Sequence, residues 1–168
     1  AKESAEQGHL EANRFKAVLD KTADYVAMHA PDTLKFVYAN QGALDQTGYS
    51  REELLQMTPL DLNPTVKAES MAEILAPLQS GIAIRFETVH KHKKGTLIPV
   101  DVQLQFVEIG PIKRLVAMAR DITERKRAEA EREQLLNDTR LSQQLLRTVL
   151  DSTPDLIFAK DRKFCYIL

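Results

Sequence analysis

The 168-residue sequence contains one cysteine, Cys165, and no tryptophan. A single cysteine excludes an internal disulfide framework, and no histidine is evident that would make Cys165 a nucleophile. The longest apolar run, Leu115 to Ala119, is too short to span a bilayer. No charge predominates either, because 23 basic and 24 acidic side chains leave a net charge of −1. Contact with nucleic acid or a membrane is therefore not favoured, and we expect a cytoplasmic protein.

Catalytic motifs are also missing. The sequence has no Gly-rich phosphate loop and no kinase, cyclase or phosphodiesterase signature. His90 and His92 would share one face of a strand, as metal ligands do, but no third ligand is evident. They lie among Lys91, Lys93 and Lys94 beside an expected turn, which favours a solvated loop end. We therefore predict no catalytic residue and no metal site.

What is present is the composition of a folded protein, with 43% hydrophobic and 28% charged residues. A chain of this length can hold one compact domain and an elongated element. Residues 1–22 are polar with apolar positions at helical spacing, which predicts an amphipathic entry helix. Because the chain begins without Met and ends on the apolar pair Ile167 and Leu168, we expect a fragment of a longer protein.

Period-two patterns predict an antiparallel sheet. Two short apolar stretches between residues 25 and 39 predict a hairpin. Apolar residues alternate with polar ones over 82–87 and again over 100–107, and the turn at Lys94 and Gly95 suits an antiparallel pair. The run from Leu115 to Ala119 is small or apolar throughout, which is typical of a strand covered on both faces.

Residues 40–80 carry short helical patterns interrupted by glycine and proline. The clearest stripe lies over 71–78, and we expect it to face the apolar side of the predicted strands. The interior between them is either a filled core, which is the default for apolar stripes, or a pocket for a small apolar ligand. The candidate pocket residues are Met71, Ile74, Leu75, Leu78, Ile84, Phe86, Val100, Val102 and Leu104.

The stretch from Thr123 to about Asp151 contains neither glycine nor proline, which predicts one long helix with Thr123 as its N-cap. Small or apolar residues recur along it with a period of seven, which indicates a weak coiled-coil seam. The alternative is a solitary charged helix. We favour a homodimer, because a helix that is polar nearly all round gains little by standing alone. The seam residues are Ala128, Leu135, Thr139, Ser142, Leu146 and Val149.

The sequence also repeats itself. Residues 15–28 align with residues 146–159 and share Val, Leu, Asp, Thr and Asp, and residues 36–38 then correspond to residues 164–166. A module that begins near Phe15 therefore begins again near Leu146.

Four segments, taken together in their order along the chain, resemble PAS domains. They are Phe36 to Asn40, Gly48 to Leu55, Phe86 to Val102 and Ala119 to Lys126. One departure is Gly42, where the family usually has alanine. The resemblance implies an α+β fold, with a five-stranded antiparallel sheet and short helices on one face, flanked by an N-terminal and a long C-terminal helix. The expected organisation is an entry helix over 1–22, a PAS domain over 23–123, a linker helix over 124–145, and the truncated start of a second PAS domain over 146–168.

The resemblance also implies a role in sensing and relay. Asp121, Ile122 and Thr123 match the family's D-x-T motif at the end of the last strand, where the carboxylate and the hydroxyl can hold the strand-to-helix turn. The alternative is an ordinary N-cap. Haem-binding members use a histidine on the helix before the central hairpin and photosensory flavin members a cysteine in the helical segment. Residues 66–80 contain no histidine and residues 40–80 contain no cysteine, so neither haem nor a photosensory flavin is expected. The cofactor stays unknown.

Together these features predict a non-catalytic, homodimeric sensory and signal-transmission module from a bacterial signalling protein. The resemblance places its output domain C-terminal to this chain, as a histidine kinase of a two-component system or as a diguanylate cyclase or phosphodiesterase. The alternative is a pure dimerisation or spacer module that binds no ligand.

Overall fold

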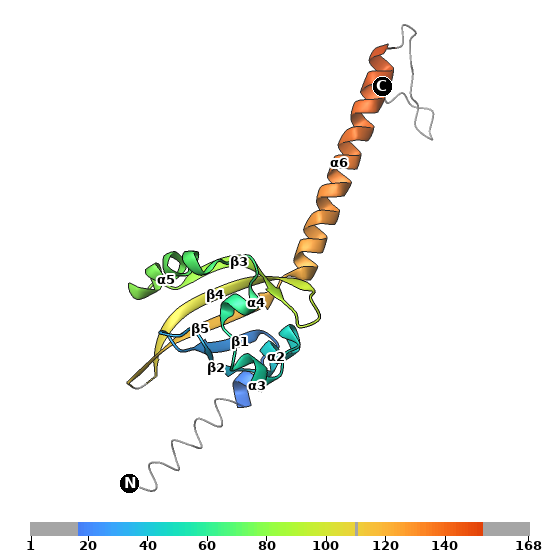
Figure 1. The fold of residues 1–168 in the computed structure, drawn as a ribbon. Coiled ribbons are helices and arrows are strands. Elements are labelled where there is room, and N and C mark those ends of the chain that lie inside the picture. Colours follow the sequence, from blue (N-terminus) through green and yellow to red (C-terminus); the bar gives the residue numbers. More distant parts are fainter. Residues whose placement is uncertain (1–16, 110, 153–168) are drawn as a thin grey trace, which may run out of the picture. The chain divides into compact units, whose positions relative to one another are not determined.

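The computed structural model describes residues 17–109 and 111–152, with a division between two compact units after Glu124. The first unit is built on a five-stranded antiparallel sheet in the order β2-β1-β5-β4-β3 (Figure 1). Each neighbouring pair of strands runs antiparallel. The strands are β1 (Tyr25–His29), β2 (Phe36–Ala39), β3 (Ile84–Lys91), β4 (Leu97–Ile109) and β5 (Ile112–Asp121).

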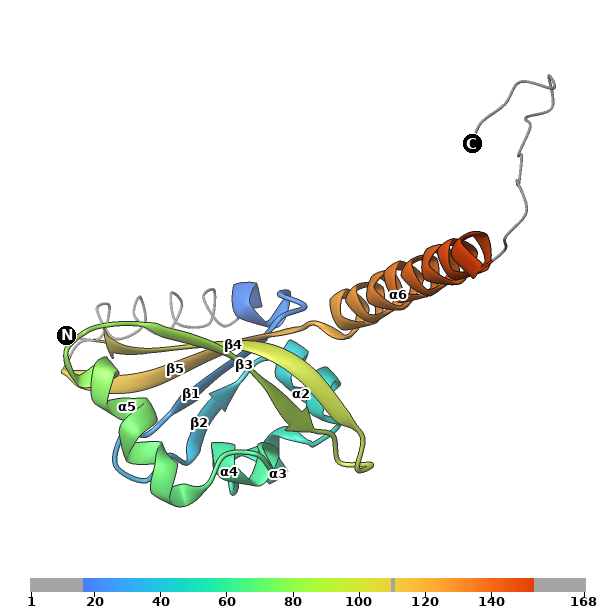
Figure 2. The same ribbon diagram turned by 90° about the horizontal axis from the view of Figure 1, so that it is seen from above.

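Short helices connect β2 to β3 and lie on one face of this sheet (Figure 2). They are short because turn residues interrupt them. Gly48 ends the first of them at φ 73°, a left-handed conformation that glycine adopts without steric cost. Pro59 begins another at its first turn, where a missing N–H costs nothing. The helices are α2 (Gln41–Thr47), α3 (Arg51–Leu54), α4 (Pro59–Leu62), the 3-10 turn η1 (Ala68–Ser70) and α5 (Met71–Gln79).

The predicted α+β fold is thus confirmed, as are the first hairpin and the central antiparallel pair. One strand boundary differs from the pattern. Ile82 was expected to open β3, but it lies before the strand and is 59% exposed. Its backbone N–H donates instead to the carbonyl of Pro77, which keeps Ile82 in the turn that ends α5. The ladder with β4 begins only at Ile84, opposite Leu104.

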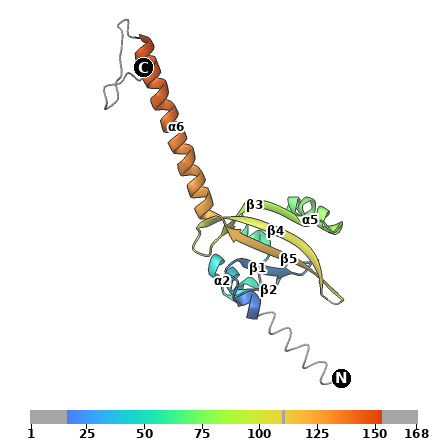
Figure 3. The ribbon, with the colours of Figure 1, turned by 180° about the vertical axis from the view of Figure 1, so that it is seen from behind.

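β5 lies in the centre of the sheet between β1 and β4, which accounts for its apolar run (Figure 3). Leu115, Ala117 and Ala119 point toward the helices, and Val116 on the opposite face is buried as well. The prediction that both faces of this strand are covered therefore agrees with its burial. The main core around it consists of Tyr25, Ala27, Phe36, Ala39, Ala43, Leu54, Leu62, Val100, Val102, Ala117 and Ala119.

Asn40 joins three segments around the start of the sheet and is fully buried. Its side-chain oxygen accepts hydrogen bonds from the backbone N–H groups of Val26 and Ala43, which caps α2. Its amide nitrogen donates to the carbonyl oxygens of Leu19, Thr22 and Asp24. The turn before β1, the strand itself and the first helix are therefore held by one side chain.

The second unit is described by α6 (Thr123–Ser152), so the predicted long helix is confirmed. None of the residues of α6 is buried. The described helices include none that is long and apolar enough to cross a membrane. Most of the expected entry helix and residues 153–168 of the expected second PAS domain lie outside the described residues, and the domain boundaries stay predictions.

Candidate functional site

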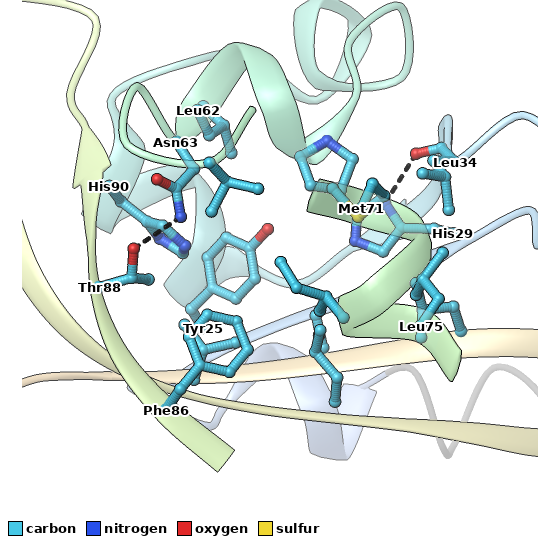
Figure 4. Close-up of a pocket in the computed structure, with 17 residues that line it drawn as sticks. Tyr25, His29, Leu34, Leu62, Asn63, Met71, Leu75, Phe86, Thr88 and His90 are labelled. Atoms are coloured by element: carbon cyan, nitrogen blue, oxygen red, sulfur yellow. Dashed lines mark hydrogen bonds between the residues drawn. The ribbon is translucent and has the colours of Figure 1, made fainter. Parts of the chain in front are cut away.

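A cavity of about 60 Å³ lies between the sheet and the segment that runs from α4 to α5 (Figure 4). It has room for a few water-sized groups. Its walls are largely apolar. The residues that line it are Tyr25, His29, Leu34, Pro59, Leu62, Asn63, Val66, Met71, Ile74, Leu75, Phe86, Thr88, His90, Val102, Leu104, Leu115 and Ala117.

Most of the candidate pocket residues contribute to this lining: Met71, Ile74, Leu75, Phe86, Val102 and Leu104. The remaining three do not. Leu78 is buried one turn further along α5, past the cavity. Ile84 lies at the beginning of β3, and Val100 is fully buried in the main core. Periodicity correctly assigns these side chains to the inner face, but the cavity opens beneath only part of that face.

His29, at the end of β1, is 1% exposed and has a fixed orientation. Its Nδ1 lies 3.2 Å from the carbonyl oxygen of Leu34. Because a carbonyl oxygen only accepts, this nitrogen carries the proton. Leu34 itself has a φ of 57°, which is uncommon for a leucine. The other ring nitrogen, Nε2, is buried without a hydrogen-bond partner, and desolvation lowers the pKa of His29 to about 4.

His90 forms the opposite wall, which contradicts its assignment to a solvated loop end. It is 8% exposed, its ring centroid lies 5.1 Å from that of Tyr25, and its Nδ1 is buried without a partner. Desolvation lowers its pKa to about 4 and also raises the pKa of the Tyr25 hydroxyl. His92 does lie at the turn, where its Nδ1 accepts a hydrogen bond from the backbone of Lys94. The expectation was wrong for His90 because β3 extends through Lys91 and turns His90 inward.

Asn63 and Thr88 supply further polar groups, and these are paired with each other. The amide nitrogen of Asn63 donates to the hydroxyl of Thr88 at 2.8 Å. The amide oxygen of Asn63 accepts hydrogen bonds from the backbone and the hydroxyl of Thr65. Both side chains line the cavity. Among the lining residues, the two imidazoles each keep a buried ring nitrogen without a hydrogen-bond partner.

The sequence held a signal for these missed residues. Thr88 and His90 continue the period-two register of Phe86 on β3, and His29 continues that of Tyr25 on β1. A search for apolar residues alone overlooks these polar side chains, although the period-two register places them on the inner face of the sheet. No aspartate, glutamate, lysine or arginine lines the cavity, and the described part of the chain brings together no group of three or more potential metal ligands. The arrangement therefore supports binding of an uncharged molecule.

The junction between β5 and α6 is held by Asp121 and Ile122. The Asp121 carboxylate accepts the backbone N–H of Thr123 at 2.7 Å, and α6 begins at Thr123. Ile122 is buried, and its N–H donates to the carbonyl of Pro99 in β4. The cap expected of Thr123 is therefore supplied by Asp121, two residues earlier, because its carboxylate reaches forward to the first N–H of the helix.

Comparison with known proteins agrees with this architecture. Residues 24–124 match the family model described as PAS domain. The chain is 34% identical over 129 residues to the methyl sulfide methyltransferase-associated sensor of Methanosarcina acetivorans, an alignment that covers 77% of this chain. It spans only 13% of that relative's length.

Solved structures share the fold. The PAS domain of an HTR-like protein from Haloarcula marismortui is 20% identical, with a TM-score of 0.65 over 73% of this chain and all of that one. A domain of a sensory box sensor histidine kinase/response regulator from Geobacter sulfurreducens is 20% identical, with a TM-score of 0.58 over 67% of this chain and 96% of the other. The sheet order, the helices on one face and the family match lead to one conclusion: this chain belongs to the PAS domain family.

Proposed function

We propose that this chain is the sensory and signal-transmission part of a multidomain signalling protein and is itself non-catalytic. In this proposal, occupancy of the cavity changes the end of β5, and the Asp121-Ile122-Thr123 junction passes the change to α6. The pocket of this proposal is formed by Met71, Ile74, Leu75, Phe86, Val102 and Leu104. Its relay is formed by Asp121, Ile122 and Thr123. The parent is a histidine kinase or a cyclic-dinucleotide enzyme. This chain lies in the cytoplasm and acts as a homodimer.

One observation carries the proposal. Leu115 and Ala117 of β5 line the cavity, and the same strand ends at Asp121, whose carboxylate caps α6. Because β5 ends at Asp121 and α6 begins at Thr123, no loop separates the strand from the helix. A displacement of these side chains can therefore be passed along the backbone to the start of α6. The similarity to the methyl sulfide methyltransferase-associated sensor of Methanosarcina acetivorans supports the sensory assignment.

A substitution that partly fills the cavity tests the relay in the chain itself. Ala117→Val adds two carbon atoms to the cavity wall, and we expect it to change the hydrogen-exchange rates of the amides from Thr123 to Arg127. The matched control is Val116→Ile, which enlarges the neighbouring residue on the opposite face of the same strand. Exchange rates that stay at wild-type values in Ala117→Val would refute the relay, provided that the variant is folded.

The second candidate, a dimerisation or spacer module with no ligand, is favoured by the small size of the cavity. An absorption spectrum and a native mass of freshly purified protein separate the two. A co-purified molecule in the mass spectrum supports sensing. A mass that corresponds to the polypeptide alone, together with a failed exchange test, supports the spacer.

A further inference from the structure

The two buried imidazoles offer more than a general apolar pocket. His29 and His90 come from opposite parts of the sheet and face the same cavity (Figure 4). Each carries a buried ring nitrogen without a hydrogen-bond partner. A buried polar atom without a partner is destabilising, so such atoms mark the places where a bound molecule would gain a hydrogen bond.

The tautomer of His29 determines whether its unpaired ring nitrogen donates or accepts a hydrogen bond. Its Nδ1 donates to Leu34, so Nε2 of the neutral ring has no proton and is an acceptor. Nε2 points away from Leu34, on the side of the cavity. The Tyr25 ring lies between the two histidines, in contact with His90, and adds a hydroxyl to the same wall (Figure 4).

The volume of the cavity and the lack of charge in its lining restrict the class of ligand further. The volume of about 60 Å³ restricts the ligand to a small molecule. The walls include no charged side chain that could pair with an ion, and burying an unpaired ion in an apolar cavity is very unfavourable. Met71, Leu75 and Leu104 supply apolar contacts for the rest of the molecule.

From these constraints, and resting on the proposed sensory function, we propose that the cavity binds a compact, uncharged molecule with an O–H or N–H group that donates a hydrogen bond to Nε2 of His29. The polar group lies at the imidazoles, and the apolar part lies against α5. Small alcohols have this chemistry, whereas ethers of the same size lack the donor and carboxylates carry a charge.

Three probes of similar size test the proposal: 1-butanol, its isomer methyl propyl ether, and butyrate. They are titrated into the 168-residue protein with isotope-labelled histidine, and the imidazole nitrogen signals are followed by NMR. We expect 1-butanol to shift the Nε2 signal of His29 saturably. The ether should bind about tenfold more weakly, since it cannot make the hydrogen bond, and butyrate should not bind.

Variants separate the role of His29 from that of the cavity as a whole. His29→Leu removes the acceptor, and we expect it to bind 1-butanol and the ether equally. The matched control His92→Ala removes an imidazole outside the cavity and should keep the wild-type preference. The comparison of the probes in the wild-type protein remains decisive if His29→Leu does not fold.

Equal affinities of the wild-type protein for the alcohol and the ether, or no saturable shift with any probe, would overturn the proposed ligand class. These outcomes are distinct from failure of the relay. If the probes do not bind but Ala117→Val still changes exchange at the junction, the relay stands without this ligand class. If 1-butanol binds but neither it nor Ala117→Val affects the junction, the ligand class stands and the relay fails.

Discussion

At the scale of single residues, Asn40 shows how one amide can serve as a structural joint. Its oxygen accepts from two backbone N–H groups and its nitrogen faces three carbonyl oxygens, so every polar function of the side chain is used. An aspartate in this position would direct an oxygen toward those carbonyls, and an alanine would leave all five backbone groups without this partner.

We therefore predict that Asn40→Ala lowers the free energy of unfolding by about 3 kcal/mol, because it removes a cap and leaves buried polar groups unsatisfied. Urea denaturation followed by circular dichroism measures the change. Gln41→Ala is the control, since the neighbouring side chain is exposed, and its effect should stay within about 0.5 kcal/mol. A loss below about 1 kcal/mol in Asn40→Ala would show that water or other groups replace the network.

The buried histidines make stability depend on pH. Both have folded-state pKa values of about 4, below the ordinary value of 6.5, because burial disfavours the charged ring. Below pH 6.5 the unfolded chain takes up protons that the folded chain does not, so stability falls as the pH decreases toward 4. Above about pH 7 the two residues contribute no further pH dependence.

We predict a loss of about 2 kcal/mol per histidine between pH 7 and pH 5. Urea denaturation at both values measures it in the wild-type protein, His29→Leu and His90→Phe, each of which should lose about half of the dependence. His92→Ala should retain all of it. A wild-type stability that is equal at the two pH values would show that the imidazoles gain solvent or a partner when they are protonated.

At the scale of elements, the passage from β5 into α6 depends on local hydrogen bonds and one buried side chain. Ile122 anchors the backbone to β4, and the exposed Asp121 provides the acceptor for the first N–H of the helix. Within the described residues, Thr123 is held through its backbone N–H and its hydroxyl makes no hydrogen bond. Asp121 and Thr123 should therefore differ when each is removed.

We predict that Asp121→Ala destabilises the protein by about 1 kcal/mol or less and increases amide exchange in the first turn of α6, because one cap is lost. Asp121→Asn keeps an acceptor oxygen and should behave nearly as the wild-type protein does. In the parent protein, Asp121→Ala should alter signalling output while Thr123→Ala has a smaller effect. Unchanged exchange in Asp121→Ala would show that the carboxylate does not hold the junction.

At the scale of the whole molecule, α6 presents apolar side chains that are exposed to solvent. Leu135, Leu146 and Val149 of the predicted seam are 60%, 62% and 53% exposed. A long helix with such residues at seven-residue spacing gains stability when a second copy covers them. The homodimer, which many PAS proteins form, is the assembly we propose.

Adjacent leucines provide a matched test of this dimer. Leu135 lies on the seam and Leu136 does not, yet both are 60% exposed. We predict that Leu135→Glu weakens dimerisation at least about tenfold, since it buries a charge in the interface. Leu136→Glu should leave the dimer intact. Sedimentation equilibrium at tens of micromolar measures both, and a monomeric wild-type protein under these conditions would rule out the proposed dimer.

The local pattern of the sequence was sufficient for the elements. Period two predicts the strands, the absence of glycine and proline after Thr123 predicts α6, and turn residues divide the helical segment. These features follow from interactions between residues close in the chain, so the strands and the inner face of the central antiparallel pair can be predicted from the pattern. The family resemblance added the α+β fold, a five-stranded antiparallel sheet with short helices on one face.

Only the tertiary structure decided what lies opposite each inner-facing residue. His29 and His90 line one cavity, whereas Leu78, Ile84 and Val100 do not contribute to its lining. The N–H group at the start of α6 is capped by Asp121 rather than by Thr123. It also explains Gly42, where a Cβ atom would lie 2.5 Å from the carbonyl oxygen of Asp24. Such contacts join segments far apart in the sequence, and their distances depend on how the layers pack, which no local periodicity records.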